Sequence, residues 1–112
     1  MPISHVVLFK VKPDHVHETK RFQEEAAKLK QIEGVIDVAF NENFSPDRAK
    51  GYRFTLAIFT SLIPNSFTHV LSVTMASREV LPIYADHPVH VAFAKEVMLP
   101  VRDDILAVDF DL

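Results

Sequence analysis

A nine-residue segment near the start of the chain, from Ile3 to Val11, is apolar on both of its faces. In an extended strand, alternate side chains point to opposite sides of the sheet. One side carries Val6 and Leu8, and the other carries His5, Val7 and Phe9. Because a strand with two apolar faces is covered on both sides, this segment predicts a sheet with helices on one face and a partner on the other.

The rest of the chain alternates between helical and extended patterns. After Pro13, apolar residues recur at three- and four-residue spacing up to Gly34, which predicts one amphipathic helix. Extended segments are predicted at 35–40, 53–60, 67–75 and 105–110. Ser77 is the predicted cap of a short helix that ends near Tyr84. Pro88 is the predicted first residue of the next helix, whose apolar side includes Leu99.

This order of elements predicts a ferredoxin-like α+β protomer, built from the split β-α-β arrangement with one extra strand. The length of 112 residues fits one domain spanning 1–112. A domain of this size buries only about two-thirds of the surface that its unfolded chain exposes. Association with a second copy is a natural way to bury more, so a homodimer is predicted.

Charge and composition exclude several classes of partner. The net charge is −3 and no basic run occurs, so we expect no nucleic acid. No apolar run approaches the roughly 20 residues that span a bilayer, so no membrane partner is expected. The absence of cysteine excludes disulfides and fits a cytoplasmic location. With two glycines there is no phosphate-binding loop, and we expect no cofactor.

Five stretches carry a resemblance to one known family. They are HVVLFK at 5–10, Gly51-Tyr52, FTHV at 67–70, YADHPVHVAF at 84–93 and ILAVDF at 105–110. With these motifs the chain resembles the stress-responsive A/B barrel family. The resemblance implies a ferredoxin-like protomer that dimerises sheet to sheet as a dimeric α+β barrel, with a cavity between each sheet and its own helices.

The resemblance also implies a site. A plant member of the family closes a polyketide chain by an intramolecular aldol condensation, with a Tyr and a His in the catalytic roles. By motif position these fall on Tyr84 and His90, and two further pocket-lining histidines fall on His5 and His69. We add His87 as a substrate-binding candidate, with capping of the helix break as its alternative role.

These residue types suit aldol chemistry. A neutral His accepts a proton near neutral pH, and a Tyr hydroxyl stabilises a developing enolate. The predicted walls of Val, Leu and Phe favour a largely apolar small molecule. A bland alternative is that these side chains are buried and satisfied by backbone or water. A metal at Asp86, His87 and His90 is a further alternative, but Pro88 spoils regular helical geometry there, and we predict none.

Three functions follow from the sequence. The first is a small-molecule-binding protein with cyclase-like acid/base activity. The second is a non-enzymatic, stress-associated dimeric protein without a substrate. The third is a module that sequesters a small ligand.

One departure from the family pattern concerns the middle of the chain. In the family, Gly-Tyr is usually followed at once by Thr-His, whereas here Gly51-Tyr52 and Thr68-His69 are separated by residues 53–67. This spacing predicts an insertion at 53–67. Because lengthening a loop costs little free energy, the fold is expected to tolerate it.

Overall fold

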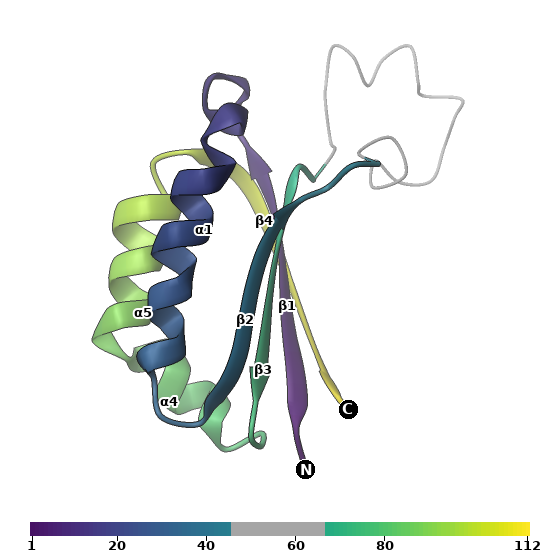
Figure 1. The fold of residues 1–112 in the computed structure, drawn as a ribbon, viewed down its shortest axis with the longest axis vertical. Coiled ribbons are helices and arrows are strands. Elements are labelled where there is room, and N and C mark those ends of the chain that lie inside the picture. The colour runs from purple at the N-terminus through teal and green to yellow at the C-terminus, as the bar shows by residue number, and fades with distance from the viewer. Residues whose placement is uncertain (46–66) are drawn as a thin grey trace.

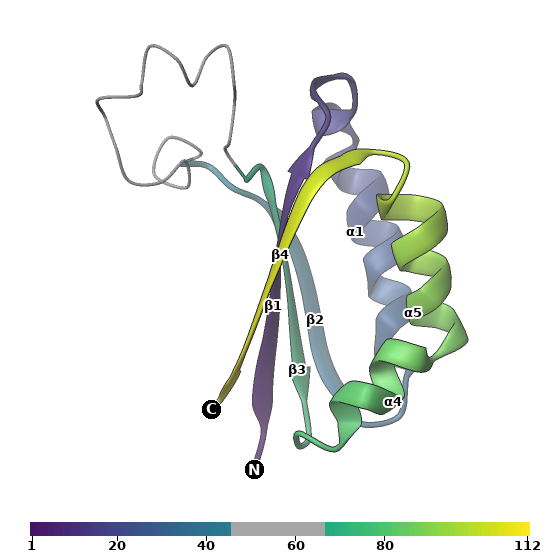
Figure 2. The ribbon, with the colours of Figure 1, turned by 180° about the vertical axis from the view of Figure 1, so that it is seen from behind.

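Helices cover one face of a four-stranded antiparallel sheet, and the two opposite views agree that they all lie on the same side (Figures 1 and 2). The computed structural model describes residues 1–45 and 67–112. Gly51-Tyr52, the strand predicted at 53–60 and all but the last residue of the predicted insertion lie outside the described residues.

The strands stand in the order β2-β3-β1-β4, as the split β-α-β arrangement requires. Their bounds are Ile3–Val11 for β1, Val35–Glu42 for β2, His69–Met75 for β3 and Arg102–Asp111 for β4. The central strand β1 pairs with β3 on one side and with β4 on the other. The ferredoxin-like α+β prediction is therefore confirmed.

The register of the sheet decides which side chains meet the helices. His5 lies opposite Val73 on β3 and opposite Asp109 on β4. Directly opposed residues share a face of the sheet, so Asp109 points to the same side as His5. Phe9 is likewise opposed to His69 and to Ile105. All of these side chains face the helices.

The first helical stretch is a succession of three segments. They are the 3-10 turn η1 at Pro13–Glu18, the helix α1 at Thr19–Ala27 and the 3-10 turn η2 at Lys28–Gln31. Gly34 follows with a φ of 94°, a conformation that favours glycine. A Cβ at this position would lie 2.6 Å from a methyl group of Val80. Gly34 therefore permits both the turn into β2 and the close approach of α4.

The second helical stretch is broken once. Helix α4 spans Val80–Asp86 and α5 spans Pro88–Ala92, with His87 extended between them at φ −67° and ψ 137°. Pro88 starts α5 as predicted. The prediction that Ser77 caps α4 is wrong, because Glu79 stands at that position and makes no capping hydrogen bond through its side chain.

A π-helical segment, η4 at Phe93–Met98, continues α5. Its wide turn is marked by a hydrogen bond from the Leu99 amide to the Ala94 carbonyl, 2.9 Å long. Leu99 itself is 52% exposed, so the prediction that it lines the apolar side is wrong. Single π-helical turns are frequent at functional sites.

The core lies between the helices and the sheet. Phe22 and Leu29 from the helical side meet Val73 from the sheet, and all three are fully buried. Each such side chain contributes roughly 1.5–3 kcal/mol relative to an exposed one. Across residues 1–45 and 67–112, none of the helices combines the length and the apolar character that crossing a bilayer demands.

Candidate functional site

A small cavity lies between the sheet and the α4–α5–η4 stretch, with a volume of about 80 Å³. Its polar lining comes from His5, Tyr84, His90 and Arg102. Its apolar walls come from the strands (Val7, Phe9, Leu71 and Ile105) and from the π-helical segment (Phe93, Ala94 and Met98). The structure therefore brings together three of the residues predicted from the sequence: His5, Tyr84 and His90.

Tyr84 is buried in this cavity, with 1% of its surface exposed. Its hydroxyl has no hydrogen-bond partner among the described residues. An unpaired buried hydroxyl costs roughly 1–3 kcal/mol, and buried polar groups are paired in the great majority of cases. Burial also raises the pKa of Tyr84, so the group remains a hydrogen-bond donor at neutral pH.

His90 lies against Tyr84, with 4.4 Å between the ring centroids. Its Nδ1 is 3.0 Å from the carbonyl oxygen of Ala85. A carbonyl only accepts, so Nδ1 carries the hydrogen and Nε2 is left as the basic nitrogen. Burial lowers the pKa of His90, and the charge of nearby His5 lowers it further, although the bond to Ala85 opposes both. His90 is therefore held as a neutral base.

His5 is anchored by Asp109, a residue that the sequence analysis did not select. The His5 Nδ1 donates a hydrogen bond to an Asp109 carboxylate oxygen, and the pair becomes an ion pair when His5 is protonated. The His5 ring meets Tyr84 edge-on at 5.6 Å between centroids. Asp109 thus orients the imidazole that forms one wall of the cavity.

His69 is completely buried but does not line the cavity. Its two ring nitrogens each lie 2.8 Å from a hydroxyl, Nε2 from Thr19 and Nδ1 from Thr68. Its ring packs edge-on against Phe22, and it contacts Phe40 as well. Burial lowers the pKa of His69. The structure places this histidine as a satisfied core residue outside the lining of the cavity.

His87 also lies away from the cavity lining. Its Nδ1 accepts a hydrogen bond of 3.1 Å from the amide of Val89, which caps the N-terminus of α5. The structure therefore supports the alternative role of His87 as a cap. Within the two described ranges, no group of three His, Cys, Asp or Glu side chains could hold a metal ion.

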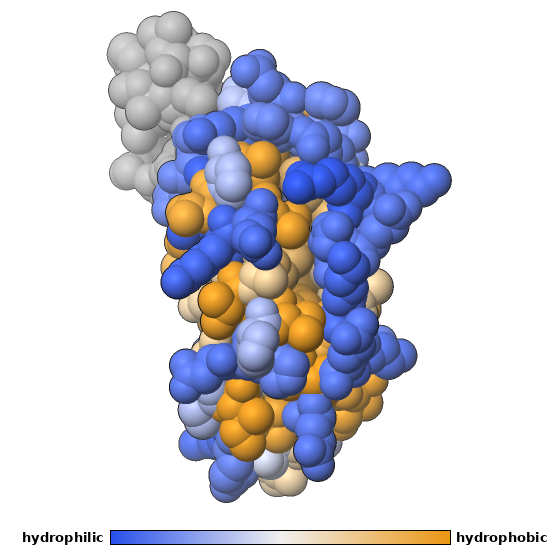
Figure 3. Space-filling model, turned by 90° about the vertical axis from the view of Figure 1, so that its left-hand side faces the viewer, coloured by the Kyte–Doolittle hydropathy of each residue, from blue (hydrophilic) through white to orange (hydrophobic). Residues whose placement is uncertain are grey.

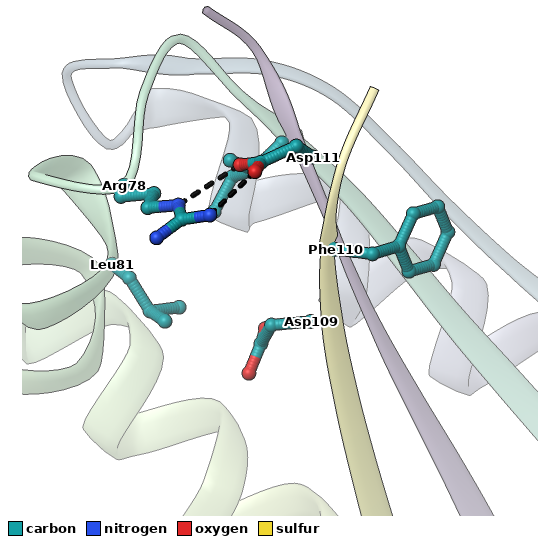
Figure 4. A pocket seen from close by; sticks show the side chains of 6 residues that line it. Arg78, Leu81, Asp109, Phe110 and Asp111 are labelled. Atoms are coloured by element: carbon teal, nitrogen blue, oxygen red, sulfur yellow. Dashed lines mark hydrogen bonds and ion pairs between the residues drawn. The ribbon is translucent and has the colours of Figure 1, made fainter.

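Two larger hollows lack such chemistry. A cleft of about 330 Å³ lies at the end of β4, where Figure 4 shows the Asp109 side chain directed into it. Arg78 also lines this cleft, and its guanidinium already binds both carboxylate oxygens of Asp111 at 2.9 and 2.5 Å. Since Asp109 is bound to His5, the charged groups of this cleft are paired with one another or with a neighbour.

The second hollow is a groove of about 210 Å³ that involves α1, α5 and η4. On the helical side of the molecule, Figure 3 shows an apolar band flanked by hydrophilic side chains. Lys28 and Glu25, which border the groove, form an ion pair at 2.7 Å. The groove therefore presents no unpaired buried polar group, and the small cavity at Tyr84 is the stronger candidate site.

Comparison with known families and proteins agrees with the sequence motifs. The family described as the stress-responsive A/B barrel domain matches residues 3–62 and 59–112. Two proteins of Arabidopsis thaliana, both described as stress-response A/B barrel domain-containing proteins, are 35% and 33% identical to this chain over 96% of its length. The chain spans only 36% and 46% of those two proteins.

Solved structures share the fold over nearly the whole chain. A dabb family protein from Mesorhizobium loti has a TM-score of 0.71 and 27% identity, covering 99% of this chain and 96% of that one. A dimeric ferredoxin-like protein from Bacteroides fragilis has a TM-score of 0.73 at 19% identity, with the same coverages. A hydroxynitrile lyase from Passiflora edulis has a TM-score of 0.71 at 16% identity, covering 99% and 93%.

Proposed function

This chain belongs to the stress-responsive A/B barrel family, and on that premise we propose that it is an acid/base enzyme acting on a small carbonyl compound. The observation that carries the proposal is the contact between Tyr84 and His90. A buried hydroxyl without a described partner lies against an imidazole whose Nε2 is left basic. A carbonyl oxygen bound in the cavity would satisfy that hydroxyl.

The proposed chemistry is a proton transfer next to the carbonyl. Nε2 of His90 removes a proton from the carbon adjacent to the carbonyl group. The Tyr84 hydroxyl donates a hydrogen bond to the carbonyl oxygen as it becomes an enolate. In an aldol-type closure, the enolate carbon then forms a bond to a second carbonyl carbon of the same molecule. The resulting alkoxide takes the proton back from the His90 imidazolium, so atoms and charges balance.

The dimensions of the cavity limit the substrate. A volume of about 80 Å³ is far below the roughly 300–1,000 Å³ of pockets that enclose drug-sized ligands. The cavity therefore accommodates a small substrate or the reacting end of a larger one, whose remaining chain would extend out of it. The fold also carries a lyase, since the neighbour from Passiflora edulis is a hydroxynitrile lyase.

We also propose that the chain forms a homodimer through the sheet face that carries no helix. On β4, the side chains Leu106, Val108 and Phe110 are between 47% and 49% exposed. They alternate with Asp109 and so lie on the face away from the helices. A row of half-exposed apolar side chains favours association, and the neighbour from Bacteroides fragilis is described as dimeric.

Deuterium exchange at carbon tests the catalytic proposal. In D₂O, the wild-type protein should accelerate exchange of the acidic hydrogens of pentane-2,4-dione above the buffer rate, followed by NMR. His90→Gln should lower this acceleration about 10²–10⁴-fold, as expected for loss of a general base. Tyr84→Phe should lower it by a similar factor. His15→Gln is the matched control, because His15 lies in η1 and does not line the cavity.

Two outcomes would contradict the proposal. One is a wild-type rate equal to that of the buffer with every carbonyl probe. The other is a His90→Gln variant, folded by circular dichroism, that exchanges as fast as the wild type. Either result would favour a non-enzymatic dimeric protein, for which the sheet face rather than the cavity is the functional feature.

A further inference from the structure

Arg102 adds a charged group to the cavity that holds Tyr84 and His90. It is the first residue of β4 and lies opposite Val11, which is buried against the helices. Arg102 therefore starts on the inner face of the sheet, where it is partly buried and lines the cavity. Tyr84, His90 and Arg102 thus border the same space of about 80 Å³.

The guanidinium of Arg102 has no hydrogen bond or ion pair with any residue in 1–45 or 67–112. By contrast, Arg78 is held by Asp111 at 2.9 and 2.5 Å, and Arg21 lies 3.3 Å from a Glu18 oxygen. The nearby Asp104 lies opposite Lys10 on the other face of the sheet, and its carboxylate accepts the amide hydrogen of Ile105 at 2.8 Å. Among the described residues, no side chain therefore competes with a ligand for Arg102.

The chemistry of arginine indicates which kind of ligand group Arg102 would bind. A partly desolvated guanidinium favours a planar oxyanion, because its forked donors match the two oxygens of a carboxylate. The other charged groups near the cavity do not compete for this role. Asp109 is bound to His5, and His90 is held neutral. Arg102 is the permanently charged side chain among the residues that line the cavity, so an anion is favoured at its end.

We propose that Arg102 selects substrates that carry a carboxylate, so that the substrate class is the short keto acids. The carboxylate binds the guanidinium while the keto oxygen accepts the hydrogen bond of Tyr84. This inference rests on the proposed function for its catalytic consequence, but carboxylate binding itself does not require turnover. A cavity of about 150 Å³ accommodates benzene. The cavity at Tyr84 has a volume of about 80 Å³ and therefore fits a ligand of a few carbon atoms.

Binding of two isosteric probes tests the inference without any reaction. Isobutyrate and isobutyramide share their shape and differ in charge, and each is titrated into the protein while backbone and methyl NMR signals are followed. The wild type should bind isobutyrate about tenfold more tightly than isobutyramide. Arg102→Gln should remove this preference, whereas Arg102→Lys should retain part of it. Arg78→Gln removes the same charge outside the cavity and should leave the preference unchanged.

Three results would overturn the inference. They are absence of isobutyrate binding at Met98 and the other cavity signals, equal affinity of the wild type for both probes, and a preference that survives in Arg102→Gln. Since Arg102 is partly exposed, the variant is expected to fold. A thermal midpoint near that of Arg78→Gln would check this.

Exchange kinetics separate this inference from the proposed function. Acetoacetate and pentane-2,4-dione differ by a carboxylate in place of an acetyl group, and each rate is divided by its own buffer rate. A preference for acetoacetate that Arg102→Gln abolishes supports both proposals. Equal acceleration of both compounds in wild type and variant supports the acid/base function and overturns the role of Arg102. Charge-selective binding without any exchange supports Arg102 as an anion site and contradicts the proposed enzyme.

Discussion

The rings of Tyr84 and His90 lie 4.4 Å apart between centroids, although a break in the helix separates the two residues. His87 is extended at this break, and its side chain caps the helix that Pro88 begins. The carbonyl of Ala85, which belongs to the helix before the break, holds His90 on the helix after it. The break therefore allows Tyr84 on one helix and His90 on the next to lie in contact. The bond to Ala85 fixes the tautomer of His90, the proposed base.

The pH dependence of carbon–deuterium exchange follows from these two groups. The pKa of His90 is lowered from its ordinary value near 6.5, so the basic form persists below that pH. The pKa of Tyr84 is raised above its ordinary value of about 10, so its proton is retained throughout the neutral and mildly alkaline range. We expect an acid limb with its midpoint below pH 6.5 and no alkaline loss up to about pH 10. A midpoint above 6.5 would contradict the assignment of His90.

Stability should also depend on pH, through the buried His69. Its pKa is lowered by burial in the folded state, so between the folded and unfolded pKa values the unfolded chain binds more protons. Stability is then fully present above the unfolded value and falls as the pH drops through this window, by at most about 1.4 kcal/mol per pH unit for one histidine. The free energy of unfolding measured with urea should decrease from pH 7 to pH 5.

A variant assigns this pH effect to its source. His69→Gln should flatten the pH dependence, whatever it does to the absolute stability, because the group that titrates on unfolding is gone. His17→Gln, at an exposed position, is the control and should keep the wild-type slope. An unchanged slope in His69→Gln would show that His69 does not contribute to it. His90→Gln, measured in parallel, gives the contribution of the partly buried His90 to the pH dependence of the free energy of unfolding.

Asp109 is expected to act as a positioning residue through His5. Asp109→Asn preserves the shape but loses the charge that binds the imidazole, and an amide can satisfy Nδ1 in the opposite sense. We expect the exchange rate to fall about tenfold with little change in probe affinity, since the orientation of His5 and not the cavity volume is affected. Asp109→Glu should recover part of the rate, which a merely structural role would not predict.

The matched control for this variant is Asp111→Asn. Asp111 also faces the helices from β4, but it binds Arg78 at the open cleft of Figure 4. Because this ion pair is exposed to solvent, it should contribute little to stability. Exchange by Asp111→Asn should match the wild type. Equal losses in both variants would mean that the effect belongs to the end of β4 and not to the bond with His5.

The proposed dimer is tested by placing a charge on the bare face of the sheet. Val108 lies opposite Val6 and is 47% exposed. Val108→Glu would bury two carboxylates in the contact without partners, which is strongly unfavourable. Light scattering should give near twice the chain mass of 12.7 kDa for the wild type and a single chain mass for the variant. Ile83→Glu, at a 58% exposed position on α4, should remain dimeric.

Much of the fold was predictable because it is encoded locally. The apolar pattern of the first strand gave Ile3–Val11 to the residue, and Pro88 marked the start of α5. The capping alternative for His87 depends only on its position before Pro88, and the structure bears it out. Ser77 failed as a cap because α4 begins only at Val80, so that a capping residue would have to stand at Glu79.

The site was less predictable because it depends on contacts between distant segments. His69 shares a face of the sheet with His5, as the alternation indicates, but packing against Phe22 and two threonine hydroxyls removes it from the cavity. Asp109 was missed because its role depends on the register of β1 against β4. A signal existed, since Asp109 continues the inward row of Ile105 and Ala107. A charged residue in an inward row needs a partner.

The two faces of strand β4 carry different kinds of side chain. Asp109 is directed toward the helices, whereas Val108 and Phe110 lie on the face that carries no helix. Deleting or inserting one residue within β4 would reverse this order and bring apolar side chains to His5 and a carboxylate to the bare face. Descendants of this chain should therefore vary in β4 by substitution, or gain and lose residues there in pairs. A lineage that lost the carboxylate at His5 but kept the apolar outer face of β4 would need a substitution at residue 109 without a shift of register.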